Sequence, residues 1–90
     1  MYYVYIIFSK KDGKLYIGFA PDLKIRLTKH HNGFVQATKY RRPLQLIHYE
    51  VYINIQDARH REIFLKGGKG HEEIKVQLKD TLRKIKYQYI

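Results

Sequence analysis

The sequence contains no cysteine, no tryptophan and only two prolines among its 90 residues. Without cysteine, the chain can form no disulfide framework and no thiolate metal site, and it has no cysteine nucleophile. Any metal ion must therefore bind through oxygen or imidazole ligands. Acidic residues are also scarce, because eight Asp and Glu residues stand against 18 Lys and Arg residues.

Long hydrophobic runs are absent as well. Residues 1–8 are apolar, but the run is too short to span a bilayer and lacks the basic leader and cleavage site of a secretory signal. We therefore expect a cytoplasmic protein without membrane contact. The apolar share of 44% and the length predict a single globular domain over 1–90, as a monomer or weak dimer.

The formal net charge of +10 favours a polyanionic partner, namely DNA, RNA or an anionic membrane surface. A membrane-binding helix would need a basic face opposite a Trp- or Phe-rich face, and no segment has this pattern. Nine tyrosines lie among the basic residues, a mixture that suits stacking on bases and hydrogen bonding to phosphates. The composition thus indicates a nucleic-acid partner, with a merely soluble basic protein as the alternative.

Three segments have the composition of β-strands. Residues 2–8, 14–19 and 44–53 are rich in β-branched and aromatic side chains. Asp12-Gly13 separates the first two segments and is a strong hairpin turn signal. The sequence therefore predicts a small antiparallel sheet that begins with a hairpin.

The hairpin turn determines which side chains share a face of the sheet. A two-residue turn at Asp12-Gly13 would pair Tyr5 with Ala20. Because side chains alternate between the two faces, this register would place one set together: Tyr5, Ile7, Tyr16 and Gly18. A loop longer by one residue would break that arrangement.

Helix signals occur in three places. They are a start at Pro21-Asp22, an N-cap at Asn54, and an apolar series at Ile74, Leu78, Leu82 and Ile85. Asn32-Gly33 ends the first helix and Gly67-Gly68 ends the second. The tail, residues 86–90, is interpreted as a short strand or a frayed end. The predicted fold is α/β, a small three-stranded antiparallel sheet with flanking helices in the order β-β-α-β-α-α.

The second helix carries an acidic side chain in the middle of its apolar stripe. At 100° per residue, this stripe consists of Ile55, Ala58, Glu62 and Leu65. A buried carboxylate is costly without a cation, so Glu62 requires either a metal ion or a salt bridge to Arg26 or Lys39. One carboxylate with water and substrate phosphate is a typical ligand set for Mg²⁺.

Tyr5 and Tyr16 are candidate reactive groups on the shared hairpin face. Gly18 leaves a bare patch of backbone there, and glycine within a strand often marks close approach by a ligand or by backbone. The pKa of a phenol is near 10, and a nearby metal ion or guanidinium would lower it. Paired aromatics on a sheet can equally be core residues, so the sequence leaves both interpretations open.

Arg26 and His30 lie four residues apart and therefore on one side of the first helix. A guanidinium can bind a non-bridging phosphate oxygen, and an imidazole can donate or accept a proton. A solvated helix face is the alternative. Lys66 and Lys69 belong to a glycine-rich stretch, residues 66–70, which lacks the spacing of a P-loop and is interpreted as a basic turn between helices.

These features together resemble the GIY-YIG nuclease superfamily. The matching strings, in order, are Tyr3-Val4-Tyr5, Leu15-Tyr16-Ile17-Gly18, Asp22-Leu23-x-x-Arg26-Leu27-x-x-His30, Thr38-Lys39-Tyr40-Arg41-Arg42-Pro43-Leu44, His48-Tyr49-Glu50 and Arg61-Glu62-x-x-Leu65-Lys66. They extend over about residues 2–70. The resemblance is strongest to small single-domain bacterial members related to the nuclease module of the bacterial excision-repair endonuclease.

The resemblance implies a hydrolytic nuclease with one Mg²⁺ or Mn²⁺ ion held by Glu62. It implies that Tyr16 helps deprotonate the attacking water with Tyr5 beside it, that Arg26 orients water and phosphate, and that His30 assists proton transfer. Lys39 would contact the backbone near the cut. We expect further nucleic-acid contacts from the basic residues Arg41, Arg42, Lys66 and Lys69.

Two positions depart from the family pattern. Val4 replaces the glycine that gives the first motif its name, and residues 72–75 lack an asparagine that some relatives carry on the last helix. The sequence thus predicts a metal-dependent DNA endonuclease or nickase with low sequence specificity, acting on branched, damaged or single-stranded DNA. The alternatives are a catalytically weak basic module that binds DNA or RNA, and a domain that acts only with a targeting partner.

Overall fold

The computed structural model describes residues 1–88, and in this range the chain forms three strands and four helices. The elements are β1 Tyr2–Ser9, β2 Leu15–Ala20, α1 Leu23–His31, β3 Leu44–Tyr52, α2 Ile55–Lys66, α3 Gly68–Gln77 and α4 Lys79–Lys84. The predicted α/β class and the three-stranded sheet are confirmed. Across the described range, no helix has the length and apolar character needed to cross a membrane.

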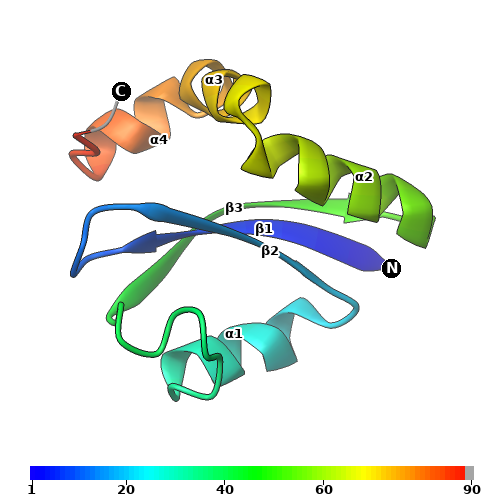
Figure 1. Ribbon diagram of the computed structural model, residues 1–90, viewed down its shortest axis with the longest axis horizontal. Coiled ribbons are helices and arrows are strands. Elements are labelled where there is room, and N and C mark those ends of the chain that lie inside the picture. The colour runs from blue at the N-terminus through cyan, green and yellow to red at the C-terminus, as the bar shows by residue number, and fades with distance from the viewer. Residues whose placement is uncertain (89–90) are drawn as a thin grey trace.

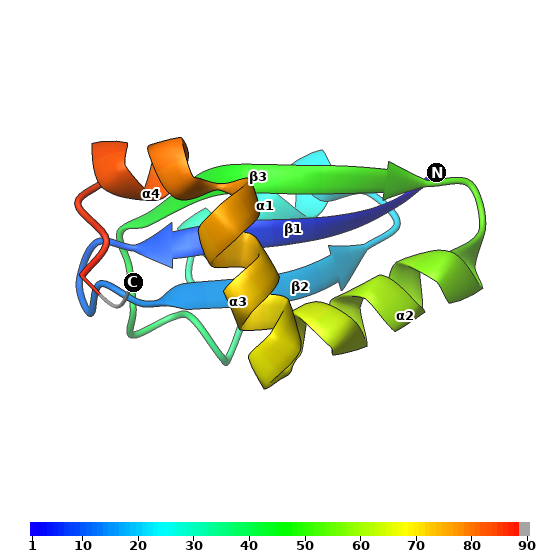
Figure 2. The ribbon, with the colours of Figure 1, turned by 90° about the horizontal axis from the view of Figure 1, so that it is seen from above.

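The strands form one antiparallel sheet in the order β2-β1-β3, and helices cover both of its faces. α1 lies against one face, whereas α2, α3 and α4 lie against the other (Figure 1). Seen from above, α2 lies beside β2, and α3 crosses the strands (Figure 2). The edge strand β2 therefore has α1 on one face and α2 on the other.

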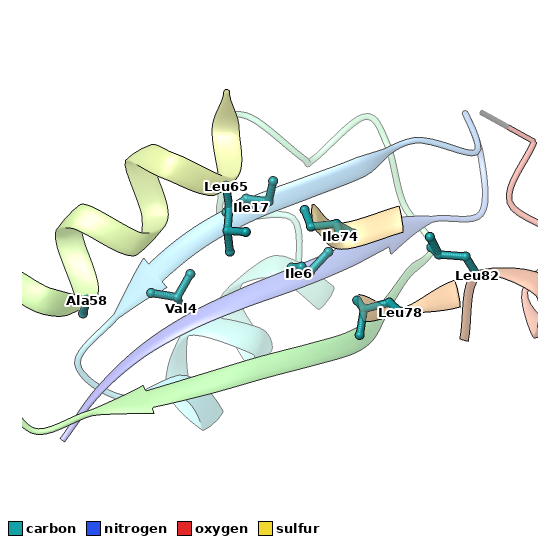
Figure 3. Close-up of a cluster of buried hydrophobic side chains, with 8 residues drawn as sticks. All are labelled: Val4, Ile6, Ile17, Ala58, Leu65, Ile74, Leu78 and Leu82. Atoms are coloured by element: carbon teal, nitrogen blue, oxygen red, sulfur yellow. The ribbon is translucent and has the colours of Figure 1, made fainter. Parts of the chain in front are cut away.

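Each face of the sheet has its own apolar cluster. The larger cluster packs the sheet against α2, α3 and α4 and contains Val4, Ile6, Ile17, Ala58, Leu65, Ile74, Leu78 and Leu82 (Figure 3). The smaller cluster packs the sheet against α1 and contains Tyr5, Ile7, Ala20 and Leu44, with Leu23 and Leu27 of α1 beside them. Burial of these side chains is the main favourable contribution to folding.

The β1–β2 hairpin has a longer loop than the sequence predicted. Ser9 N donates to the Lys14 carbonyl at 2.9 Å, which leaves residues 10–13 as the loop. Tyr5 therefore pairs with Gly18 and not with Ala20, so the predicted register is wrong by two residues. Because the error is an even number of residues, the alternation is preserved, and Tyr5 and Tyr16 still point to the same face.

The helix boundaries follow local capping chemistry. The Asp22 carboxylate accepts a hydrogen bond from Ile25 N at 3.0 Å, and the Asn54 side chain accepts one from Gln56 N at 2.8 Å. Gly33 follows the end of α1 with a φ of 79°, a conformation that favours glycine. These caps confirm the predicted starts of α1 and α2.

The predicted third helix is divided into α3 and α4 at Leu78. The backbone of Leu78 departs from helical geometry, with φ −107° and ψ 26°. Ile74, Leu78 and Leu82 all remain buried in the larger cluster, so the bend keeps the apolar series against the twisted sheet. The predicted tail forms no strand over residues 86–88, and its last two residues, 89 and 90, lie outside the described range.

We predict that Gly70→Ala destabilises the fold, whereas Gly68→Ala does not. A Cβ atom on Gly70 would lie 2.0 Å from the Phe64 carbonyl oxygen, so α2 and α3 would have to separate. A Cβ atom on Gly68 would meet no atom within 4 Å. Urea unfolding should show a loss of about 1–3 kcal/mol for Gly70→Ala and a small gain for Gly68→Ala. Equal unfolding midpoints would contradict this close helix contact.

Candidate active site

The site is built around the hydroxyl group of Tyr5, which is fully buried between the sheet and α1. A Cβ atom built on Gly18 would lie 2.4 Å from both the Tyr5 hydroxyl oxygen and Cζ. The Tyr5 ring thus extends from β1 beneath the backbone of β2. The close approach indicated by Gly18 is therefore made by the ring of Tyr5, and any side chain in place of Gly18 would displace it.

α1 supplies the two partners of this hydroxyl group. Arg26 Nε donates to the Tyr5 oxygen at 3.4 Å, and His30 Nε2 lies 2.8 Å from the same oxygen. The other ring nitrogen of His30, Nδ1, lies 2.7 Å from Thr38 Oγ1. His30 has no exposed surface, whereas Arg26 is half-buried. The structure therefore brings Tyr5, Arg26 and His30 together, and it rejects a solvated helix face as the environment of His30.

Tyr16 lies on the same side of the sheet and is half-buried. Its ring centroid is 5.3 Å from that of His30 and 6.4 Å from that of Tyr5. Both phenols interact with the Arg26 guanidinium, and the hydrogen bond to Tyr5 raises the pKa of Arg26 most. Tyr16 and Arg26 are thus the accessible members of the group, and Tyr5 and His30 lie behind them.

Burial determines the protonation of the two inner groups. It raises the pKa of Tyr5 above 10.0, although Arg26 acts in the opposite direction. This is contrary to the lowered phenol pKa considered from sequence. Burial also lowers the pKa of His30 to about 4, with smaller contributions from the charges of Arg26 and His31. Near neutral pH, both groups are therefore uncharged hydrogen-bonding links.

Glu62 approaches the site from α2, on the opposite face of the sheet. Arg59, three residues earlier, stacks on the β2 side chain Phe19 with its guanidinium 4.0 Å from the ring centroid. Because residues three apart share a helix side, Glu62 is presented on the β2 side of α2. Its charge is near enough to contribute to the raised pKa of Tyr5.

The cation that accompanies Glu62 differs from both salt-bridge partners considered from sequence. Glu62 Oε2 accepts from Lys66 Nζ at 3.0 Å, and Oε1 lies 3.8 Å from Arg59 Nη1. The Glu62 side chain is 13% exposed, but those of Lys66 and Arg59 are each 53% exposed. Such exposed partners contribute little stability, about 0–1 kcal/mol, so another cation can replace them at small cost.

Among residues 1–88, no group of three or more His, Asp or Glu side chains is arranged to hold a metal ion. The available donor is the single carboxylate of Glu62. This donor fits Mg²⁺ or Mn²⁺ only with water and substrate phosphate as the other ligands, which is the usual mode of Mg²⁺ binding. A site of this kind would bind the ion weakly without substrate.

The basic residues predicted to bind nucleic acid have different environments. Arg41 Nε donates to Asp12 Oδ2 at 2.6 Å, and this hydrogen bond is the largest cause of the fall in the pKa of Asp12 to about 2. Arg42 donates to the carbonyls of Lys39 at 3.0 Å and His31 at 3.3 Å. Both arginines therefore hold the loop before β3 in place, a role that sequence reasoning missed.

The three lysines of the predicted interface are more accessible. Lys39 is half-buried with its Nζ 4.8 Å from the Tyr40 ring centroid, Lys66 pairs with Glu62, and Lys69 is exposed in the first turn of α3. Nucleic-acid contact by these lysines and by the two arginines stays a prediction.

Sequence reasoning also missed a hydrogen-bonded cluster around Glu50. Its carboxylate accepts from Arg61 Nε at 2.9 Å, from Tyr52 OH at 2.7 Å and interacts with His48 Nε2 at 3.0 Å. Burial alone would raise the pKa of Glu50, but these contacts lower it to about 2. The available signal was the alternation of His48, Glu50 and Tyr52 on a strand face that must lie against helices.

The fold and this site define a small nuclease-type domain of the α/β class. Residues 1–75 match the GIY-YIG catalytic domain, and the chain therefore belongs to the GIY-YIG family. The family is one of nucleases, which are hydrolases that act on nucleic acid. The resemblance inferred from the motifs is confirmed.

The chain is also similar to curated proteins that carry the name UPF0213. A UPF0213 protein of Staphylococcus saprophyticus is 38% identical over 76 residues, which cover 83% of this chain and 92% of that protein. A UPF0213 protein of Pediococcus acidilactici is 37% identical over 79 residues, covering 82% and 78% of the two chains. No solved structure matches the chain.

We predict that His30 makes the fold less stable as the pH falls from 6.5 to 4. In this window the unfolded chain takes up a proton at His30, whose ordinary pKa is 6.5, but the folded chain does not, because its pKa is about 4. The unfolding free energy should therefore fall with falling pH, by about 3 kcal/mol at most. Urea titrations at several pH values, with an NMR titration of His30, measure this effect.

The matched control is His60→Asn, which changes an exposed histidine and should retain the wild-type pH slope. The carboxyl groups of Asp12 and Glu50 contribute only at lower pH, as they titrate toward about 2. An NMR midpoint for His30 near 6.5 would show that its ring is not held neutral.

Proposed function

We propose that the chain is a divalent-metal-dependent endonuclease or nickase that hydrolyses phosphodiester bonds of DNA with low sequence specificity. The observation that carries this proposal is the convergence at β2 of the Arg26 guanidinium, held by the Tyr5 hydroxyl, with Tyr16 and the Glu62 carboxylate. A guanidinium beside a phenol and a carboxylate can bind a phosphodiester and accept a proton from water.

Arg26 would bind the reacting phosphate. Its Nε is engaged by Tyr5, so the terminal nitrogens of the fork can donate to non-bridging oxygens. Fixing the guanidinium in advance means that it stabilises the negative charge of the transition state without reorganising. The surrounding net charge of +10 attracts the polyanionic substrate to this position.

Tyr16 would orient the attacking water and receive its proton, because it is the accessible phenol of the pair. Glu62 would hold one Mg²⁺ or Mn²⁺ ion with water and phosphate as further ligands. When bound, the ion would supply Lewis-acid stabilisation of the charge on phosphate and leaving oxygen. Tyr5 and His30, which have no exposed surface, would act on the substrate only through Arg26 and Tyr16.

The absence of sequence specificity follows from the kind of contacts available. Lysine and arginine contacts to phosphate carry no base information. Branched or single-stranded DNA is the proposed substrate, with RNA as an alternative, and the cytoplasm is the proposed location. A panel of duplex, flap, junction and single-stranded DNA together with RNA, with and without Mn²⁺, separates these substrates.

We predict that Glu62→Gln and Tyr16→Phe each reduce the rate of metal-dependent nicking by about 10²-fold or more, because each removes a group proposed to act on the reacting atoms. DNA binding should survive in both variants. The matched control is Glu72→Gln, which changes an exposed glutamate that pairs with Lys75 on α3 and should leave cleavage unchanged. Cleavage of supercoiled plasmid at wild-type rate by Glu62→Gln would refute the proposed metal ligand.

A nucleic-acid-binding module with weak catalysis is the second candidate function. The pairing of Glu62 with Lys66 and Arg59 favours it, because these cations compete with a metal ion for the carboxylate. This alternative predicts binding whose logarithm falls linearly with the logarithm of salt concentration, without any metal-dependent product. The substrate panel above decides between the two functions.

A further inference from the structure

Thr38 is a buried residue in a loop whose other residues are mostly polar and exposed. The loop joins α1 to β3, and Thr38 is fixed within it by two backbone hydrogen bonds, Thr38 N to the Val35 carbonyl at 3.1 Å and Arg41 N to the Thr38 carbonyl at 2.9 Å. Its hydroxyl oxygen lies 2.7 Å from His30 Nδ1. The family pattern and the proposed reaction assign this hydroxyl no role.

The direction of each hydrogen bond in this group follows from Arg26, since a guanidinium can only donate. The Tyr5 oxygen therefore accepts from Arg26 Nε. A neutral Tyr5 has one proton left to donate, and the remaining polar neighbour is His30 Nε2, at 2.8 Å. Nε2 must then be unprotonated, so the ring proton of neutral His30 lies on Nδ1 and points to Thr38 Oγ1.

The reverse arrangement leaves a proton without an acceptor. If Nε2 carried the ring proton, both Arg26 and His30 would donate to the Tyr5 oxygen, and the Tyr5 hydroxyl proton would be buried without a partner. An unsatisfied buried donor costs about 1–3 kcal/mol. Ionisation of Tyr5 would remove this conflict, but burial raises the pKa of that phenol.

We propose that Thr38 is a positioning residue, whose hydroxyl oxygen accepts the Nδ1 proton of His30, fixes the histidine tautomer and thereby holds Arg26 through Tyr5. The chain of hydrogen bonds runs from Arg26 to Tyr5, then to His30, and ends at Thr38. It crosses from β1 to α1 and the following loop. Its contribution to a reaction rests on the proposed function, but its hydrogen-bond directions do not.

The groups that face His30 agree with a neutral ring. Tyr5 and Tyr16 approach from the sheet, Arg26 and His31 belong to its own helix, and Thr38 approaches from the loop. No carboxylate is among the causes that shift the His30 pKa, and its cationic neighbours disfavour a second ring proton. Thr38 therefore meets a ring with one proton, whose position its oxygen can select.

The first test is the tautomer of His30 in the wild-type protein, measured near neutral pH by long-range ¹H–¹⁵N correlation on ¹⁵N-histidine-labelled protein. The expected result is a protonated Nδ1 and an unprotonated Nε2. A protonated Nε2 would overturn the proposal. This measurement requires no substrate, metal ion or cleavage, so it decides the proposal even if the proposed nuclease activity is not found.

The second test compares Thr38→Val with Thr38→Ser, because valine preserves the shape but removes the acceptor, and serine restores it. Thr38→Val should lose the single tautomer and the separate, slowly exchanging Arg26 Nε–H resonance, whereas Thr38→Ser should retain both. Thr28→Val, which changes an exposed threonine on α1, is the matched control. A Thr38→Val variant that keeps both signals would refute the role of the hydroxyl.

On any substrate that the wild-type protein cleaves, Thr38→Val should lower kcat about tenfold, as expected for loss of one buried hydrogen bond, and Thr38→Ser should recover most of it. If Thr38→Val fails to fold, the wild-type tautomer and the Thr38→Ser spectra still decide the proposal. Loss of the Nδ1-protonated tautomer in Thr38→Ser would count against it.

Discussion

The site depends on one buried hydroxyl group that must satisfy two neighbours at once. The Tyr5 oxygen accepts from Arg26 and lies within hydrogen-bonding distance of His30, beneath the side-chain-free backbone of Gly18. These contacts join β1, β2 and α1 at a single point. Since a buried polar group without a partner is costly, the position of Arg26 is coupled to the packing of the hairpin on α1. The same constraint explains why a glycine is needed on β2.

The reactive groups consequently fall into two sets that differ in exposure. Tyr16, Arg26 and Glu62 retain some accessible surface, whereas Tyr5 and His30 have none. The inner pair is uncharged near neutral pH, so it can fix the guanidinium without neutralising its charge. In a chain with a net charge of +10, this arrangement keeps one particular cation oriented among many mobile ones. Orientation, more than charge, is what separates Arg26 from the surface lysines.

The sequence could predict what depends on periodicity, and it failed where distant segments meet. Alternation placed Tyr5 and Tyr16 on one face, but the length of the loop shifted their register, because Asp12-Gly13 occupies only part of a four-residue turn. Helical spacing put Arg26 beside His30 and Glu62 on the inner side of α2. No local pattern could show that Thr38 reaches His30, because this contact depends on how the loop folds back over α1.

The position of Glu62 depends on a network on the far side of its own helix. Arg61 is bound to Glu50 on β3 and to Glu73 on α3, at 2.9 and 2.8 Å, whereas Arg59 stacks on Phe19 of β2. These two arginines engage opposite sides of α2, and the buried Ala58 and Leu65 hold its inner face to the sheet. Rotation of α2 is therefore opposed in both directions. The carboxylate is thus directed to the β2 edge by contacts that never touch it, and this is why a single acidic residue can serve where other sites require a cluster.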